Sequence, residues 1–368
     1  MLTDLEKRLV EISYKLKLSH LSAYFTAVDL IDKIYSVKKK DEPFILSQGH
    51  AFAALAVVLE KYEGKDAEEL VKKYMTHPTR CKEDGVDCST GSLGQGLTIA
   101  VGMALADRSK DVYVLTSDGE MAEGCCWEAL KIAGEQRLEN LRITVNANGY
   151  SAFNKVDVDL LDLRMQYFYP SLVIKTNMFK FPSWLQGIRG HYEKIDSEER
   201  IANYPRHPSQ RGEFAYHLYK QMAKNKDIIL VLPDLGYGMF TSHCEDMPER
   251  VINCGASEQG CMGVAIGLAI CGKIPFIFSI TNFVVYRPFE WLRNYLDHEG
   301  IPVKILGGGR DVDYQEDSYT HTCCDVKGVL DQLPNIVQFW PQNNDEIEKM
   351  CEEMVTNNKP SFISLTRK

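Results

Sequence analysis

Two polar residues that follow apolar runs have side chains suited to holding a metal ion. Asp118 comes after the run that begins at Val112, and Asn148 comes after the run that begins at Leu141. Each run predicts a buried parallel strand, and ligands bind at the carboxyl edge of such sheets. The spacing of 30 residues (148 minus 118) fits a strand, a helix and a second strand. The pair favours Mg²⁺ or Ca²⁺ carrying a diphosphate, although Ser-Asp-Gly and Asn-Gly also suit ordinary turns.

A glycine-rich stretch at residues 90–96 (TGSLGQG) precedes a predicted helix. Glycines let the backbone approach a ligand, so this composition is typical of a nucleotide- or phosphate-binding loop. Taken alone, the stretch also suits a Rossmann dehydrogenase. The order of elements argues against that class, because the stretch comes before the Val112 strand and no acidic residue is placed to bind a ribose.

A glutamate and several histidines have the chemistry of proton carriers. Glu258 precedes an apolar helix of small residues that runs to about Ile270. A carboxyl group in apolar surroundings has a raised pKa and shares a proton with a ring nitrogen near neutral pH. The helix dipole also favours an exposed glutamate there, so a structural role stays open at this point. Histidines carry protons near pH 7, so the nine histidines of the chain are candidates by type, although each one taken singly also suits a structural role.

Composition and length bound the class of protein. The chain has 368 residues, enough for two domains, and its 42 basic and 51 acidic residues give a net charge of -9 without a basic stripe. We therefore expect no nucleic-acid partner. The apolar run at residues 51–59 is too short to cross a bilayer, and no export signal begins the chain. The 11 cysteines form no C-x-x-C pair, which favours reduced thiols in the cytoplasm.

Apolar runs alternate with helical patterns, which predicts an α/β fold with two mainly parallel sheets flanked by helices. A linker is expected at residues 203–209, where two prolines accompany polar residues. Helices are expected at residues 97–107 and 126–136, and strands at residues 112–116, 141–145, 171–175, 228–232, 276–280, 303–306 and 362–365.

Considered jointly, these segments resemble the transketolase family of thiamine-diphosphate-dependent enzymes. The segments that carry the resemblance are residues 46–50 (LSQGH), 90–96, 118–129 and 256–259 (ASEQ). The resemblance runs from about residue 5 to residue 368. It implies a diphosphate-binding domain at residues 1–205 and a pyrimidine-binding domain at residues 210–368, in a short form that lacks the family's third domain.

The resemblance also implies roles for individual residues. Glu258 would hydrogen-bond the pyrimidine ring, Phe283 would stack on it, and Asp317 would contact a donor hydroxyl. The implied metal ligands are Asp118, Asn148 and Tyr150. The implied catalytic residues are Glu258, His20, His50, His77, His321 and Asp317. The implied cofactor-binding residues are Gly91, Leu93, Asp118, Gly119, Glu120, Asn148, Glu258, Phe283, Tyr286, His50 and His191.

The activity implied is transfer of a two-carbon ketol unit from a ketose to an aldehyde, with thiamine diphosphate and a divalent metal. The family works as homodimers with active sites at the subunit interface. Gly309 replaces a phosphate-binding histidine of the family, so non-standard or unphosphorylated sugars are expected, with Arg310 as a relocated anion site. The alternatives are a thiamine-dependent decarboxylating enzyme, such as a 2-oxoacid dehydrogenase component or a deoxyxylulose-phosphate-type synthase, and a catalytically silent binding subunit.

Overall fold

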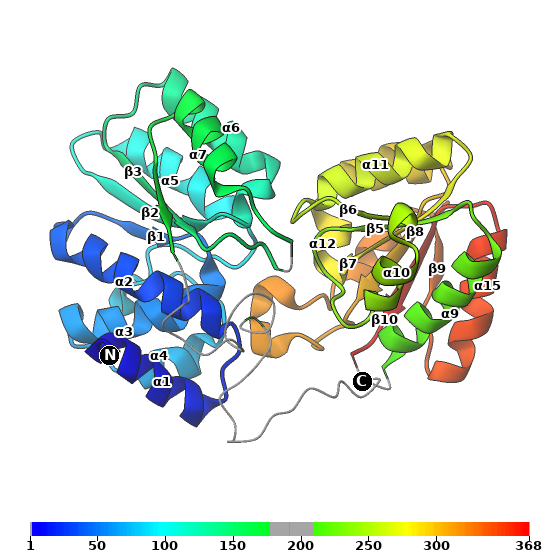
Figure 1. The fold of residues 1–368 in the computed structure, drawn as a ribbon, viewed down its shortest axis with the longest axis horizontal. Helices are drawn as coiled ribbons and strands as arrows, with labels where there is room; N and C mark the ends of the chain where they lie inside the picture. Colours follow the sequence, from blue (N-terminus) through cyan, green and yellow to red (C-terminus); the bar gives the residue numbers. More distant parts are fainter. Residues whose placement is uncertain (1, 153, 177–190, 192–208, 368) are drawn as a thin grey trace. The chain divides into compact units, whose positions relative to one another are not determined.

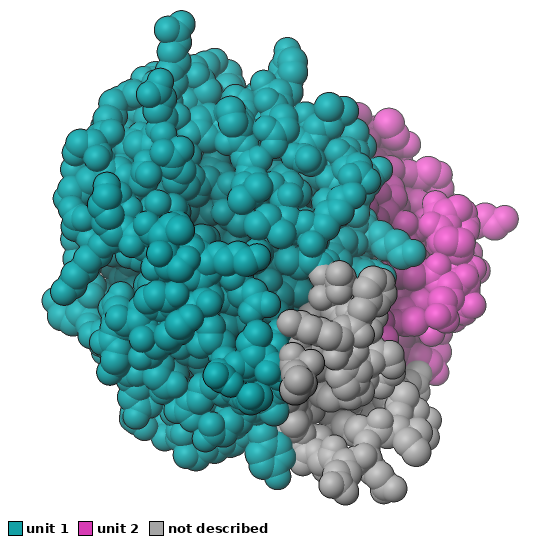
Figure 2. All heavy atoms as spheres, turned by 60° about the vertical axis from the view of Figure 1, so that its left-hand side comes forward, with its two compact units in different colours: residues 1–200, 316–320 teal, residues 201–315, 321–368 magenta. Residues whose placement is uncertain are grey.

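The computed structural model of the chain describes residues 2–152, 154–176, 191 and 209–367. It divides into two compact units, one of residues 1–200 with 316–320 and one of residues 201–315 with 321–368 (Figure 2). The linker expected at residues 203–209 lies outside the described residues except for Ser209.

The first unit is built on a four-stranded parallel sheet with the strand order β1-β2-β3-β4 (Figure 1). The strands are Phe44–Leu46, Val112–Ser117, Leu141–Ala147 and Leu172–Lys175. Because all four are parallel, their carboxyl ends meet at one edge of the sheet. The α-helices are α1 (Asp4–Leu16), α2 (Leu21–Val37), α3 (Phe52–Glu63), α4 (Ala67–Tyr74), α5 (Gln95–Ala106), α6 (Gly124–Glu135) and α7 (Val158–Phe168).

Strand geometry divides the apolar side chains of this sheet between two cores. Ile45 belongs to one buried cluster, and its neighbours Phe44 and Leu46 belong to the other. Successive side chains of a strand point to opposite faces, so both faces of a parallel sheet need an apolar cover. Helices α1 to α4 cover one face and α5 to α7 cover the other, as Figure 1 shows.

The second unit is built on a six-stranded parallel sheet with the order β6-β5-β7-β8-β10-β9. The strands are β5 (Ile228–Leu232), β6 (Val251–Asn253), β7 (Ile274–Ile280), β8 (Lys304–Gly308), β9 (Val337–Phe339) and β10 (Ser361–Leu365). The helices are α9 (Gln210–Lys224), α10 (Thr241–Asp246), α11 (Glu258–Ile270), α12 (Thr281–Tyr286), α13 (Phe289–Trp291), the π-helix η6 (Leu292–His298), α14 (Val326–Leu330) and α15 (Ile347–Thr356).

The same alternation produces two cores here. Ile277 of β7 packs with α11 and α12, whereas its neighbours Phe276 and Phe278 pack with α9 and α15. Figure 1 shows α11 on one side of this sheet and α9 with α15 on the other. The short helix α12 follows β7 directly, so the residues after that strand are held close to the carboxyl edge of the sheet.

The predicted fold class is confirmed, since both sheets are parallel and flanked by helices. Each strand expected from an apolar run is present, with ends that differ by at most two residues. Three strands of three residues each, β1, β6 and β9, were not expected. None of the eleven cysteines, all of which are described, forms a disulfide. Within the described residues no helix is long and apolar enough to cross a membrane.

Candidate active site

Asp118 lies at the carboxyl end of β2 and is only 3% exposed. Its Oδ1 accepts a hydrogen bond from the Gly119 amide at 3.0 Å, and its Oδ2 accepts one from the Gly149 amide at 2.7 Å. Burial raises the pKa of this carboxyl to about 6, against the opposing effect of the amide donors. No basic side chain of the described residues forms an ion pair with Asp118. A buried carboxylate of this kind suits a metal ion as its counter-charge.

The turn after β3 brings a second side-chain oxygen, that of Asn148, to the same edge. Asn148 Oδ1 accepts a hydrogen bond from the Tyr150 amide at 2.9 Å, and Gly149 between them has φ of 84°. Because the Gly149 amide is bonded to Asp118, this turn is fixed beside the carboxylate. No group of three His, Cys, Asp or Glu side chains in the described part of the chain is placed to hold a metal. The Asp118 carboxylate and the Asn148 amide oxygen are oxygen donors of the kind that hard cations prefer.

The glycine-rich loop before α5 is packed against a histidine. Gly91 has φ of 129°, and a Cβ at that position would lie 2.7 Å from the ring of His77. A Cβ on Gly49, in the segment after β1, would lie 2.6 Å from the Gly91 amide nitrogen. Leu93 is half-buried. Only glycine satisfies both the positive φ and the close approach at Gly91, so the loop and the histidine position one another.

Glu120 holds this loop to the sheet. It is fully buried, its Oε1 accepts from Ser47 Oγ at 2.6 Å and the Gly94 amide at 2.7 Å, and its Oε2 accepts from Thr116 Oγ1 at 2.6 Å. Burial raises the pKa of Glu120, and these donors oppose that change. Since both carboxylate oxygens have donors from the protein, Glu120 positions the loop, and its expected contact with a cofactor stays a prediction.

Four of the predicted histidines gather in the first unit. The ring of His20 lies 4.2 Å from that of His191, 5.8 Å from that of His50 and 6.5 Å from that of His77, measured between centroids. His20 has the left-handed φ of 63°, and its amide donates to the His191 carbonyl at 2.9 Å. A non-glycine residue in that conformation is strained, and such strain gathers at functional sites. The sequence separates these rings by up to 171 residues (191 minus 20), yet the fold brings them together.

Burial keeps two of these imidazoles neutral. Desolvation, with a smaller effect of His191 and His77, lowers the pKa of His50 to about 3. Desolvation also lowers the pKa of His77 to about 4, although the Asp317 carbonyl opposes the shift. His77 Nδ1 lies 2.6 Å from that carbonyl, which can only accept, so Nδ1 carries the proton and Nε2 is the acceptor nitrogen. At pH 7 both rings therefore act as neutral hydrogen-bonding groups.

Glu258 begins α11 and is 2% exposed. Its surroundings differ from the purely apolar environment that the sequence predicts. Ser279 Oγ donates to Oε1 at 2.8 Å, and Arg287 Nη1 donates to Oε2 at 2.5 Å. The helix that follows is apolar as expected, but the carboxylate itself faces the end of β7 and the end of α12, where polar side chains lie.

Aromatic side chains surround the same edge of the second unit. Phe283 on α12 packs edge-on against His321, with centroids 4.9 Å apart. His321 is 9% exposed, and Tyr286 is 39% exposed. Phe283, His321 and Glu258 thus belong to the second unit, whereas Asp317 belongs with the first unit, at His77.

Arg310 does not serve as the relocated anion site that the sequence suggested. Its guanidinium donates to Ser364 Oγ and to the carbonyls of Ser364 and Pro341, and it lies 3.4 Å from Gln210 Oε1. These acceptors belong to the protein, so Arg310 ties β8 to β10 and α9. A Cβ on Gly309 would lie 2.3 Å from the Tyr314 ring, so no histidine side chain fits there without displacing that tyrosine.

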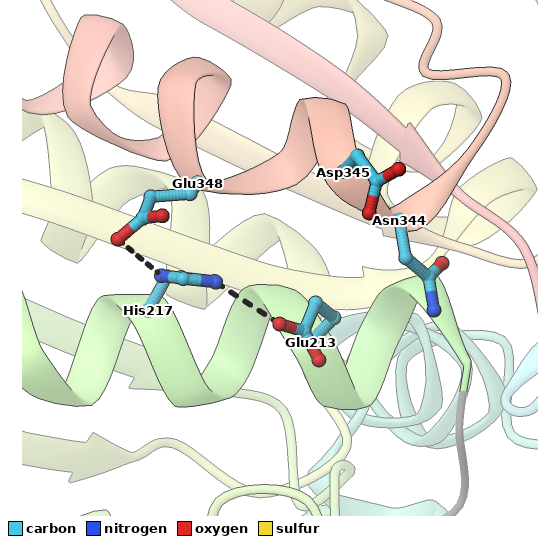
Figure 3. Close-up of a pocket in the computed structure, with 5 residues that line it drawn as sticks. All are labelled: Glu213, His217, Asn344, Asp345 and Glu348. Atoms are coloured by element: carbon cyan, nitrogen blue, oxygen red, sulfur yellow. Dashed lines mark hydrogen bonds and ion pairs between the residues drawn. The ribbon is translucent and has the colours of Figure 1, made fainter.

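An acidic pocket in the second unit is separate from these residues. It has a volume of about 420 Å³ and lies between α9 and α15 (Figure 3). His217 Nε2 lies 3.0 Å from Glu213 of the same helix α9, and its Nδ1 lies 3.4 Å from Glu348 of α15, so only the second contact connects the two helices. These contacts give His217 a structural role.

Two family descriptions match the chain. Residues 35–168 match "Transketolase, thiamine diphosphate binding domain", and residues 209–368 match "Transketolase, pyrimidine binding domain". One of the subunits of the apulose-4-phosphate transketolase of Phocaeicola vulgatus is 31% identical over 162 residues, which cover 39% of this chain and 57% of that protein. Mouse (Mus musculus) transketolase is 23% identical, with 89% of this chain and 65% of that protein covered.

A solved structure described as "Split gene transketolase, inactive beta4 tetramer" is 28% identical, with a TM-score of 0.40 and coverage of 44% of this chain and 52% of that chain. The chain spans 44% to 65% of the length of the curated relatives that it matches.

Proposed function

The chain belongs to the transketolase family, and from this premise we propose that it transfers a two-carbon ketol unit from a ketose donor to an aldehyde acceptor. One observation carries the proposal, namely the cluster of His20, His50, His77 and His191 beside the Gly91 loop. A polyhydroxylated sugar needs several hydrogen-bonding groups around one reacting carbon, and clustered neutral imidazoles provide them. The cluster therefore favours ketol transfer over decarboxylation of a simple 2-oxoacid, which carries fewer hydroxyl groups.

The residues present fit thiamine diphosphate with Mg²⁺ or Ca²⁺. Asp118, Asn148 and Tyr150 would hold the metal and diphosphate, and Glu258, Phe283 and Tyr286 would hold the pyrimidine. The backbone at Gly91 and Leu93 would contact the aminopyrimidine, and Gly119 would lie beside the diphosphate. When bound, this group would supply a nucleophilic carbon for the ketose carbonyl and a cationic ring that takes up the electron pair of the carbon-carbon bond that breaks.

The chain's own residues would supply the proton transfers. Glu258 would hold a proton at the pyrimidine nitrogen, with Ser279 orienting its carboxyl group. His77 would accept through Nε2 from a sugar hydroxyl, because Nδ1 donates to the Asp317 carbonyl. Since the pKa values of His50 and His77 lie near 3 and 4, both rings would keep this neutral role over the physiological pH range.

The donor and acceptor are proposed to be non-standard or unphosphorylated sugars. Four of the five N–H donors of Arg310 are directed at Gln210, Pro341 and Ser364, and Tyr314 covers the position beside Gly309. Sugar-phosphate recognition relies on charge-assisted hydrogen bonds that these residues do not offer. The working protein is proposed to be a homodimer whose active sites are completed across the subunit interface, with the buried Glu123 and the exposed Glu128 of the α6 region at that interface.

The Glu258→Gln substitution tests this function. Loss of the shared proton should lower aldehyde release from a ketose at least about a hundredfold, the scale of lost acid-base catalysis. Glu290→Gln, at an exposed glutamate, is the matched control and should keep full turnover. Undiminished turnover in Glu258→Gln, or release of carbon dioxide from pyruvate by the unaltered protein, contradicts the proposal.

A further inference from the structure

The proposed proton-carrying glutamate has a charged partner to which no role has been assigned. Arg287 Nη1 donates to Glu258 Oε2 at 2.5 Å, while Ser279 Oγ donates to Oε1. The pair is largely removed from solvent, since the two side chains are 14% and 3% exposed. Both carboxylate oxygens of Glu258 therefore have donors from the protein.

The guanidinium of Arg287 also covers an aromatic ring of the proposed site. Its Cζ lies 4.4 Å from the centroid of the Phe283 ring. The two residues are four positions apart (287 minus 283) at the end of α12, so they share one face of the helix. Gln259 Nε2 donates to the Arg287 carbonyl at 2.9 Å and fixes the backbone there. A flat group thus contacts both Phe283 and Glu258.

An aminopyrimidine at this site needs the same two contacts. It is a flat ring that would stack on Phe283 and hydrogen-bond Glu258, as the proposed function requires. The guanidinium and the aminopyrimidine cannot cover one face of Phe283 and bond the same carboxylate oxygen at the same time. We propose that Arg287 is a positioning residue that competes with the pyrimidine for Glu258, so that this ion pair opens when the cofactor binds. This inference rests on the proposed function.

Competition of this kind sets the affinity for the cofactor. When only the fraction of molecules with an open pair is able to bind, the apparent dissociation constant rises in inverse proportion to that fraction. Removing the guanidinium leaves Glu258 with Ser279 alone, and a buried carboxylate that has lost its charged partner is unfavourable. A pyrimidine nitrogen that then supplies the missing partner binds more tightly.

The test is the dissociation constant for thiamine diphosphate with Mg²⁺, measured by isothermal titration calorimetry. Arg287→Met places a flexible, apolar side chain over Phe283 and removes the guanidinium that donates to Glu258. We expect it to lower the dissociation constant at least about tenfold, because the competing pair is gone. Arg293→Met, at an exposed arginine of η6, is the control and should leave the constant within about twofold.

A second pair of proteins separates competition from a general structural effect. In the Glu258→Gln background the neutral amide forms no ion pair with the guanidinium, so adding Arg287→Met should change the dissociation constant by less than about twofold. Equal or weaker binding by Arg287→Met, in a protein whose circular dichroism matches that of the parent, overturns the inference alone. Failure of every protein, the parent included, to bind thiamine diphosphate overturns the proposed function and the inference with it.

Discussion

The substitution His77→Asn tests the electrostatic state of the histidine cluster. The ring of His77 is 4% exposed, and burial lowers its pKa from 6.5 to about 4. An asparagine nitrogen lies near the position of Nδ1, so the variant keeps a donor for the Asp317 carbonyl while it loses the titrating group. The comparison therefore isolates the cost of protonating the buried ring.

The sign and size follow from linkage. Above pH 6.5 the ring is neutral in both folded and unfolded chains, so the contribution of His77 to stability is fully present. As the pH falls below 6.5 the unfolded chain takes up a proton, whereas the folded chain does so only near pH 4. Between pH 7 and pH 5 this difference removes about 2 kcal/mol from the free energy of unfolding. The free energy of unfolding of His77→Asn should not show this decrease.

The assay is unfolding in guanidinium chloride at pH 5, 6 and 7, in a chelating buffer without cofactor. The free energy of unfolding of the parent should fall by about 2 kcal/mol more than that of His77→Asn between pH 7 and pH 5. His298→Asn, at an exposed histidine, should follow the parent at every pH. Parallel pH dependence of the parent and His77→Asn would refute the assignment of a neutral, desolvated His77.

Two further predictions concern the cofactor loop and the shared sites. Gly91→Ala should lower the free energy of unfolding by about 1 to 3 kcal/mol and weaken thiamine diphosphate binding in calorimetry, because the added carbon strains φ and meets the His77 ring. An unchanged midpoint and affinity would contradict the packing described for this loop. Mixed Asp118→Asn and Glu258→Gln chains, each inactive alone, should recover about a quarter of the parent turnover after exchange of protomers, because half of the dimers contain one intact site. Recovery of none, with exchange shown by mass spectrometry, would mean that each site is built within one chain.

The strands could be predicted where apolar runs of four or more residues are bounded by polar ones. Runs such as the one at Val112 indicate parallel strands because both faces of the sheet are covered. The unexpected strands β1, β6 and β9 have three residues each, too few to show any periodicity. Their existence depends on pairing with longer neighbours.

In the candidate site, too, residues that follow a strand could be predicted, whereas partners that meet only through tertiary packing could not. Asp118 and Asn148 could be placed at one edge because each follows a parallel strand. The Arg287 partner of Glu258 could not be predicted, since the two are 29 residues apart (287 minus 258) and meet only when α12 packs beside α11. The sequence favoured Arg310 as an anion ligand because the residues around it do not reveal which distant protein groups accept its hydrogen bonds. Its acceptors at Pro341 and Ser364 are tertiary contacts.

The central claim is ketol transfer, and product analysis tests it most directly. The purified protein, loaded with thiamine diphosphate and Mg²⁺, would be offered unphosphorylated and phosphorylated ketoses with an aldehyde acceptor, and the products identified by mass spectrometry. The account predicts a new ketose two carbons longer than the acceptor, together with a donor aldehyde two carbons shorter, and faster turnover of the unphosphorylated donor. Carbon dioxide as the released product, or no turnover of any ketose, would contradict it.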